Sequence, residues 1–158
     1  MSIKKLLVAH DLTRASEPAL ALSLRLARQL GATLVVLHVF PPEQERSNLF
    51  GIYSVEEMEQ QTGFARREQA AASKILRDKL EQLNPPGGDA VVCEIILRHG
   101  KAVDVVNEVA SSTGTQLIVV GTNSRRGLEQ LVLGSVSANI IRTAPCPVVV
   151  ARPADAND

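Results

Sequence analysis

Two short stretches in the C-terminal third of the chain contain the residue types that hold anions in proteins. Val120–Arg125 begins at the last residue of the apolar run Leu117–Val120, and Gly134–Ser137 begins an amphipathic segment. A strand, a glycine-containing loop and a helix N-terminus together present free backbone N–H groups and the positive end of a helix dipole. Glycine also lets the ligand approach the backbone closely. These residues therefore predict an anion-binding site.

An arginine pair beside the first stretch favours a ligand that carries phosphate. Arg125 and Arg126 place two guanidinium groups next to the loop, where they can bind phosphate oxygens. The same pair would also suit an exposed turn, which is the common place for arginine. The pair supports a phosphate ligand without requiring one.

The remainder of the chain alternates strand and helix patterns that would position these residues. The expected strands are Ile3–Ala9, Thr33–Val39, Val91–Leu97, Gln116–Val120 and Pro147–Ala151. The expected helices run from Thr13 or Ser16 to Gly31, from about Glu56 to Leu83 with a break near Thr62–Gly63, over Ala102–Val109, and over Ser135–Thr143. This pattern predicts an open, parallel, doubly wound α/β sheet. In such sheets the ligand binds beyond the carboxyl ends of the strands, where the strand order reverses.

Polar residues at those strand ends allow other kinds of site. His10, His38 and His99 all fall at the ends of the first three strands, so together with Asp11 they could bind a metal ion, or they could be separate hydrogen-bonded side chains. Asp11 could also be the phospho-acceptor of a receiver-like domain. That hypothesis is disfavoured because such a site needs an aspartate at the end of the third strand and a lysine after the fifth, where this chain has Arg98-His99 and Arg152-Pro153.

Composition and charge argue against several classes of partner. Lysine plus arginine equals aspartate plus glutamate at 17 each in 158 residues, so charge gives no reason to expect nucleic acid or an anionic membrane as a partner. No apolar run approaches the roughly 18 residues of a membrane span. Cys93 and Cys146 lack metal-ligand spacing and are expected to be reduced, buried thiols of a cytoplasmic protein. We expect one domain over residues 1–152 and a frayed tail at 153–158.

Several motifs in combination resemble the universal stress protein family over residues 3–152. The residues that carry the likeness are Ala9–Asp11, Ala27–Val39, His99-Gly100, Gly121–Ser137 and Ala144–Val150. The resemblance implies a five-stranded Rossmann-like sheet with strand order 3-2-1-4-5 and helices on both faces. It also implies a homodimer formed through the last strand, at Val148–Val150. Members of this family divide into those that bind ATP and those that do not.

The ATP-binding members carry a phosphate loop with the pattern G-x-x-G-x9-G-[S/T]. This chain keeps the spacing from Gly121 to Gly134-Ser135, but Ser124 replaces the second glycine. If that glycine is needed for a positive φ, serine costs about 1–2 kcal/mol. If only clearance is needed, a hydrogen bond from the serine hydroxyl to phosphate contributes about 0.5–1.5 kcal/mol. The two effects are similar in size, so the sequence does not decide whether Ser124 weakens or strengthens ATP binding.

By this resemblance, Asp11 and Val39 hold the adenosine, while the loop and the helix start hold the phosphates. The implied site for ATP, with Mg²⁺ as an optional companion, consists of Asp11, Val39, Val120, Gly121, Ser124, Arg125, Gly134, Ser135, Val136 and Ser137. The expected function is an ATP-binding regulatory protein of the stress response. Two alternatives stay open: a nucleotide-free dimeric interaction module that uses its dimer surface and the loop Glu43–Tyr53, and a weak ATPase.

Overall fold

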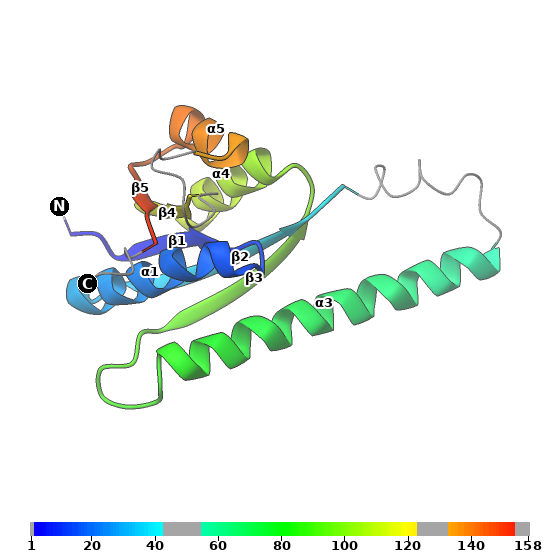
Figure 1. The fold of residues 1–158 in the computed structure, drawn as a ribbon, viewed down its shortest axis with the longest axis horizontal. Coiled ribbons are helices and arrows are strands. Elements are labelled where there is room, and N and C mark those ends of the chain that lie inside the picture. Colours follow the sequence, from blue (N-terminus) through cyan, green and yellow to red (C-terminus); the bar gives the residue numbers. More distant parts are fainter. Residues whose placement is uncertain (1, 43–54, 123–132, 154–158) are drawn as a thin grey trace.

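Strands and helices alternate along the chain in a computed structural model that describes residues 2–42, 55–122 and 133–153 (Figure 1). The strands are β1 (Lys5–Ala9), β2 (Thr33–Phe40), β3 (Cys93–His99), β4 (Leu117–Gly121) and β5 (Val148–Ala151). The helices are the short 3-10 helix η1 (Arg14–Ser16) and the α-helices α1 (Glu17–Leu30), α3 (Val55–Leu83), α4 (Ala102–Thr113) and α5 (Ser135–Thr143). The expected order of elements is confirmed, and strand boundaries move by at most two residues.

The five strands form one parallel sheet in the order β3-β2-β1-β4-β5, which confirms the expected fold class. Strand β1 lies in the centre, where Leu7 is in register with Val35 of β2 and Ile118 of β4. The chain first adds strands on one side of β1 and then crosses to the other side. The strand order therefore reverses between β1 and β4, and a ligand site is expected at the carboxyl ends of these strands.

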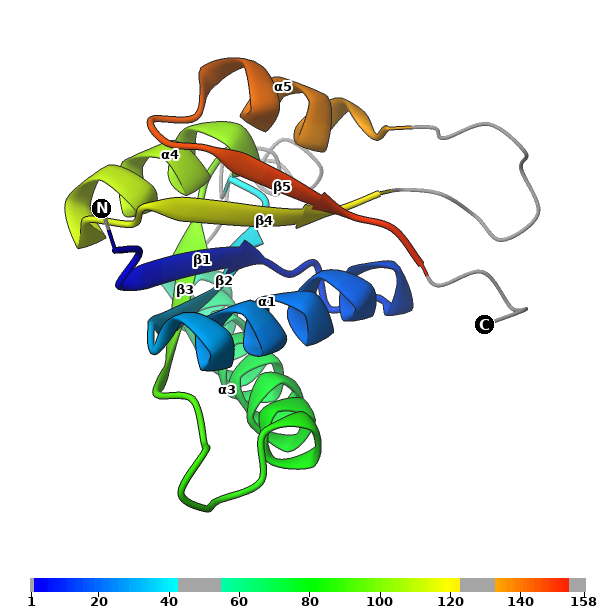
Figure 2. The same cartoon turned by 90° about the vertical axis from the view of Figure 1, so that its left-hand side faces the viewer.

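Helices cover both faces of the sheet, with α1 and α3 on one side and α4 and α5 on the other (Figure 2). Alternation along β1 sends Leu6 and Val8 into the core beneath α1 and α3, and Leu7 into the core beneath α4. Because both faces are buried, the central strands are almost continuously apolar. This arrangement leaves the strand ends as the place where polar side chains can gather.

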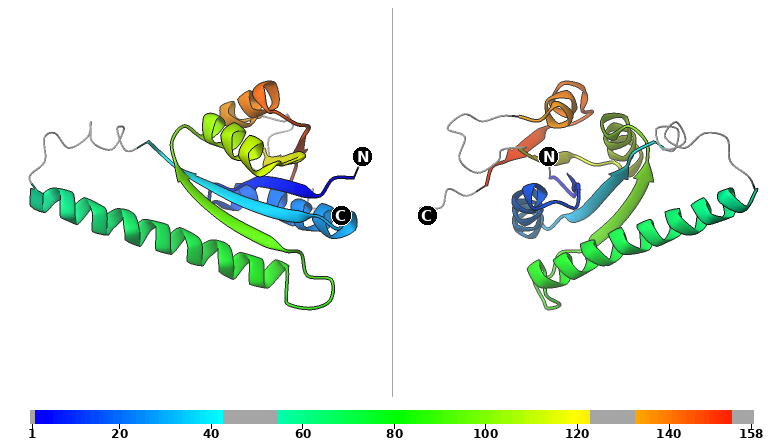
Figure 3. Two further views of the ribbon diagram at one scale, coloured as in Figure 1. Left: turned by 180° about the vertical axis from the view of Figure 1, so that it is seen from behind. Right: turned by 45° about the vertical axis from the view of Figure 1, so that its right-hand side comes forward.

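Helix α1 begins and ends where its sequence signals indicate. Pro18 lies in its first turn, where its missing N–H removes no helical hydrogen bond, and Gly31 ends the helix in a left-handed conformation at φ 61°. Helix α3 is continuous over 29 residues, so the expected break near Gly63 is not present. Its N-terminal part reaches past the ends of the strands (Figure 3), while Leu76 and Leu80 pack into the core.

The two cysteine side chains are less buried than the sequence predicts. Cys93 and Cys146 are free thiols, but each is only half-buried, and they lie by opposite edge strands, β3 and β5.

Among the helices that the structure describes, none combines the length and the apolar character needed to cross a membrane. The loop at residues 43–53, Ser124, Arg125 and Arg126, and the tail beyond Pro153 lie outside the described residues.

Candidate functional site

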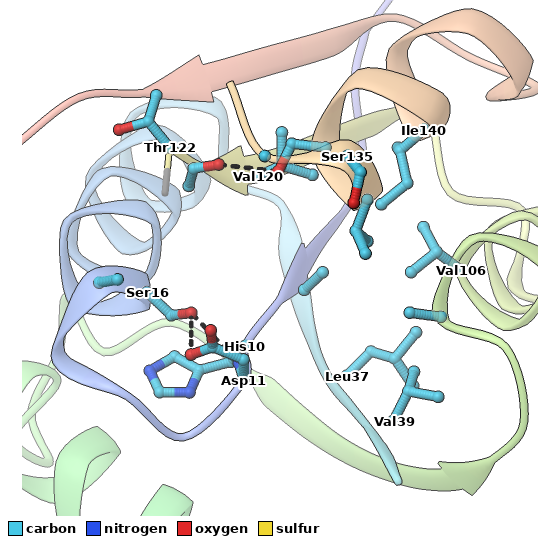
Figure 4. A pocket seen from close by; sticks show the side chains of 17 residues that line it. His10, Asp11, Ser16, Leu37, Val39, Val106, Val120, Thr122, Ser135 and Ile140 are labelled. Atoms are coloured by element: carbon cyan, nitrogen blue, oxygen red, sulfur yellow. Dashed lines mark hydrogen bonds between the residues drawn. The ribbon is translucent and has the colours of Figure 1, made fainter. Parts of the chain in front are cut away.

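A pocket of about 220 Å³ opens at the carboxyl ends of the central strands, at the point where the strand order reverses (Figure 4). One wall is apolar and comes from β2, α4, β4 and α5. Its side chains are those of Leu37, Val39, Ala102, Val106, Val120 and Ile140. The other wall is polar and comes from the segments after β1 and β4 and from the start of α5. It contains Asp11, Ser16, Thr122, Ser135 and Ser137. An apolar pocket with a few convergent polar groups is typical of a small-molecule site.

The start of α5 supplies hydrogen-bond donors to this pocket. Gly134 is the N-cap residue, and no side chain caps the helix there. The N–H of Ala138 donates to the Gly134 carbonyl at 2.9 Å, which is the first hydrogen bond of the helix. The preceding three N–H groups, at residues 135–137, therefore have no carbonyl partner within α5. Ser137 Oγ donates to the Gly121 carbonyl at 2.9 Å and thereby ties the helix start to the end of β4. The dipole and these N–H groups favour an anion.

The segment between β1 and α1 supplies a hydrogen-bond acceptor to the pocket, the carboxylate of Asp11. Asp11 Oδ1 accepts hydrogen bonds from Ser16 Oγ at 2.6 Å, from Thr13 Oγ1 at 2.6 Å and from the Thr13 N–H at 2.9 Å. The sequence offers Ser16 as a possible cap of α1, but its side chain makes no cap hydrogen bond. Instead, Thr13 caps η1 through the N–H of Ala15. The Ser16 hydroxyl donates to Asp11, as Figure 4 shows.

Hydrogen bonding and burial set the charges at this segment. Burial would raise the pKa of Asp11, but the hydrogen bonds from Ser16 and Thr13 outweigh it, and the pKa lies below its ordinary value of 3.8. Burial lowers the pKa of His10 from 6.5 to about 4, because it disfavours the charged ring. At neutral pH the pocket therefore borders an ionised Asp11 and a neutral His10.

The three strand-end histidines do not converge on one point. His38 Nδ1 donates to the His10 carbonyl at 2.8 Å, whereas Phe40 stands between His38 and His99, with its ring centroid 4.6 Å from the first and 4.9 Å from the second. Within residues 2–42, 55–122 and 133–153 there is no group of three or more histidine, cysteine, aspartate or glutamate side chains that could hold a metal ion. Each ring has its own hydrogen-bond partner, because His10 Nδ1 accepts from the Leu12 N–H and His99 Nε2 lies 3.2 Å from Gln69 Nε2.

The structure brings most of the sequence-predicted site residues together around this pocket. They are Asp11, Val39, Val120, Gly121, Gly134, Ser135, Val136 and Ser137. Ser124 and Arg125 belong to the segment that the structure does not describe. Sequence reasoning missed Ser16, Thr122 and the apolar residues of α4 as parts of the site. Ala102 and Val106 have the helical spacing of core residues, and only the position of α4 at the strand ends shows that they also line the pocket.

Gly121 is required by a close approach of two backbone segments. A Cβ atom at Gly121 would lie 3.0 Å from the Ala15 carbonyl oxygen, at the edge of η1. We therefore expect Gly121→Ala to lower the free energy of unfolding by about 1–3 kcal/mol, since η1 would have to move. Gly88→Ala is a matched control, because a Cβ there has no neighbour within 4 Å. Urea unfolding of both variants checks this, and equal stability of Gly121→Ala and the parent chain would contradict it.

Comparison with known proteins adds to this geometry. A sequence model of the universal stress protein family matches residues 2–152. The universal stress protein YxiE of Bacillus subtilis is 32% identical over 151 residues, which are 94% of this chain and 98% of that protein. Among solved structures, the universal stress protein UspA from Lactobacillus plantarum superimposes with a TM-score of 0.75 at 19% identity, over 96% of this chain and 99% of that chain.

Two further solved structures are described as complexes with a nucleotide. A universal stress protein in complex with cAMP has a TM-score of 0.65 at 20% identity, over 96% of this chain and 98% of that chain. The universal stress protein from Archaeoglobus fulgidus in complex with dAMP has a TM-score of 0.57 at 21% identity, over 96% of this chain and 99% of that chain. At these identities the likeness establishes a shared fold.

Proposed function

The chain belongs to the universal stress protein family, and from this premise we propose that it is a regulatory protein that binds an adenine nucleotide, ATP, in the pocket at the ends of β1 and β4. One observation carries the proposal. The pocket has backbone N–H groups outside the helical hydrogen-bond ladder at the start of α5 on one side, a carboxylate acceptor at Asp11 on another, and an apolar wall. A nucleotide has the matching parts: anionic phosphates, a sugar with donors, and an aromatic ring whose faces are apolar.

The charges of the pocket favour one orientation of the nucleotide. The phosphates belong beside Gly134–Ser137, where the helix dipole and the backbone N–H groups favour negative charge. They are kept away from the Asp11 carboxylate, which is ionised at neutral pH and would repel them. The nucleoside then lies toward Asp11 and Val39, with its ring against Val106 and the neighbouring apolar wall. Mg²⁺, where present, would enter on the phosphate oxygens, the ligands it prefers at nucleotide sites.

The complexes of family members with cAMP and dAMP support an adenine nucleotide as the ligand class. Thermal unfolding with ATP, ADP and AMP, each with and without Mg²⁺, tests the proposal. A ligand that binds only the folded chain adds about 2.7 kcal/mol at a hundred times its Kd, so the midpoint should rise with concentration. No rise with any of the three at millimolar concentration would favour the nucleotide-free interaction module.

Restoring glycine at position 124 tests how this chain differs from the ATP-binding pattern. Ser124→Gly should tighten ATP binding about fivefold or more if the serine strains the loop, because about 1–2 kcal/mol is then recovered. It should instead weaken binding by a similar factor if the hydroxyl donates to a phosphate. Titration calorimetry of the parent and the variant measures the ratio. An unchanged Kd would show that position 124 does not influence the ligand.

We also propose that the edge strand β5 pairs with β5 of a second copy to form a homodimer. Strand β5 is hydrogen-bonded to β4 on one side and lies at the edge of the sheet. Val148, Val149 and Val150 are half-buried within the single chain. An uncovered apolar edge with unpaired backbone groups favours such pairing. Sedimentation at micromolar concentration should give twice the monomer mass, and Val149→Lys should give the monomer. A monomeric parent chain would contradict the proposal.

A further inference from the structure

We propose that Ser16 and Thr13 are positioning residues, which hold the Asp11 carboxylate as a fixed hydrogen-bond acceptor for the bound nucleotide. This inference rests on the nucleotide site proposed above and assigns roles to two residues that the sequence did not place in that site. Both hydroxyls lie in the segment between β1 and α1, which borders the pocket through Asp11 and Ser16. Neither hydroxyl needs to touch the ligand for this role.

The hydrogen bonds are directional and fall on one carboxylate oxygen. Ser16 Oγ and Thr13 Oγ1 each donate to Asp11 Oδ1 at 2.6 Å, and the Thr13 N–H donates to the same oxygen at 2.9 Å. Ser16 Oγ also accepts from the Asp11 N–H at 3.1 Å, so Ser16 fixes both the backbone and the side chain of Asp11. Among the described contacts of the carboxylate, all three donors are on Oδ1, which leaves Oδ2 to accept from a ligand.

The Ser16 hydroxyl donates to Asp11 instead of capping α1. It is 7% exposed and precedes the first residue of α1, the position at which serine normally caps a helix. Its side chain nevertheless makes no cap hydrogen bond with α1. Burying a hydroxyl requires a partner, and here that partner is the carboxylate that borders the pocket. This choice favours a role in orienting Asp11 over a role in stabilising the helix.

The backbone of this segment is strained in a way that supports the same role. Leu12, between Asp11 and Thr13, has φ 66°, and it is the one non-glycine residue with positive φ in the described part of the chain. This conformation is unfavourable for a residue with a Cβ atom. It is maintained by hydrogen bonds on both sides, including one from the Leu12 N–H to His10 Nδ1 at 3.0 Å. Strain that the surroundings maintain is common at ligand sites, where it preorganises a side chain.

The charge of Asp11 provides an observable that a merely structural role would not change. The two hydroxyls contribute to the lowered pKa of Asp11, together with the Thr13 N–H and a smaller effect of His10. His10 is the titratable neighbour among the described residues, and Lys79 of α3, His38 of β2 and Glu17 of α1 act on His10 in turn. Removing a hydroxyl should therefore raise the pKa of Asp11, whether or not a ligand is present.

The test uses Ser16→Ala together with the pair Thr13→Val and Thr13→Ser on the exposed side of the segment. Ser16→Ala and Thr13→Val should each weaken ATP binding about tenfold, because each removes a hydrogen bond to a charged group. Thr13→Ser keeps the hydroxyl and should bind like the parent chain. In a background of Asp11→Asn, Ser16→Ala should cause little further loss. Carbon-13 NMR titration of the Asp11 carboxyl should give a higher pKa in Ser16→Ala and Thr13→Val than in Thr13→Ser.

The outcomes distinguish this inference from the proposed function. If the parent chain binds ATP and the Ser16 and Thr13 variants bind it equally well, the positioning role is wrong and the nucleotide site stands. If ATP binding falls but the pKa of Asp11 stays the same in both variants, the hydroxyls act by another route and the inference is overturned. If the parent chain binds no ATP, both proposals fail. Should Ser16→Ala not fold, the comparison of Thr13→Val with Thr13→Ser decides.

Discussion

Gly134→Val is expected to abolish the stabilisation of the chain by ATP while leaving the fold intact. Gly134 has φ −62° and ψ 155°, a conformation that valine adopts readily, so the backbone should tolerate the change. The residue also lines the pocket and immediately precedes the free N–H groups of α5. A branched side chain there would occupy the space that a phosphate needs to reach those N–H groups. We expect no stabilisation of this variant by ATP at concentrations up to the millimolar range.

Thermal unfolding and titration calorimetry of Gly134→Val measure this effect. The unliganded midpoint should stay within a few degrees of the parent value, and the rise with ATP should disappear. Gly87→Val is a suitable control, because a Cβ at Gly87 has no neighbour within 4 Å and the residue lies in the loop after α3, away from the pocket. Unchanged ATP binding by Gly134→Val would show that the phosphates do not lie at the start of α5.

Acid is expected to destabilise the fold by about 3 kcal/mol through His10 alone as the pH falls from neutral to about 4. His10 is 1% exposed, and its Nδ1 accepts from the Leu12 N–H, a bond that requires an unprotonated nitrogen. The unfolded chain takes up a proton at this residue near pH 6.5, whereas the folded chain resists until about pH 4. The stabilisation is therefore fully present above 6.5 and is lost as the pH falls through that window.

The variant His10→Asn isolates this contribution. Asparagine offers an oxygen that can accept from the Leu12 N–H, and it does not titrate. Apart from Asp11, whose pKa His10 lowers slightly, the carboxylates lose their stabilising charges in both proteins alike, so the difference in slope between the two belongs chiefly to His10. Urea unfolding from pH 7 to 4 should give a parent chain whose free energy of unfolding falls more steeply than that of the variant. Parallel curves would contradict a buried, neutral His10.

The fold is predictable from the sequence because local and long-range signals agree. Pro18 and Gly31 delimit α1, and the apolar runs that become β1, β2 and β4 predict strands that are buried on both faces. The order of strands follows from the family resemblance, and the structure has the same order. Gly63 is misleading, because one glycine costs only about 1 kcal/mol inside a helix, and α3 runs through it without a break.

The site is less completely predictable, for physical reasons. Asp11 and Gly134 stand out in the sequence, since a carboxylate directly after a buried strand and a glycine directly before a helix are typical of ligand sites. The contribution of Ser16 depends on the turn at Leu12, whose positive φ no local pattern indicates in a leucine. Val106 has core spacing, and only the packing of α4 over the strand ends brings it to the pocket. Periodic spacing shows that a residue faces the core, and it does not show which element or pocket that residue contacts.

Equilibrium dialysis of the purified chain against ATP tests the proposed nucleotide site most directly. We expect saturable binding that approaches one ATP per chain, with ADP and AMP competing for the same site. Competition is expected because all three share the nucleoside that would lie toward Asp11 and Val39. The absence of saturable binding up to millimolar ATP, in a folded chain and with Mg²⁺ present, would contradict the proposed site and leave a nucleotide-free interaction module in its place.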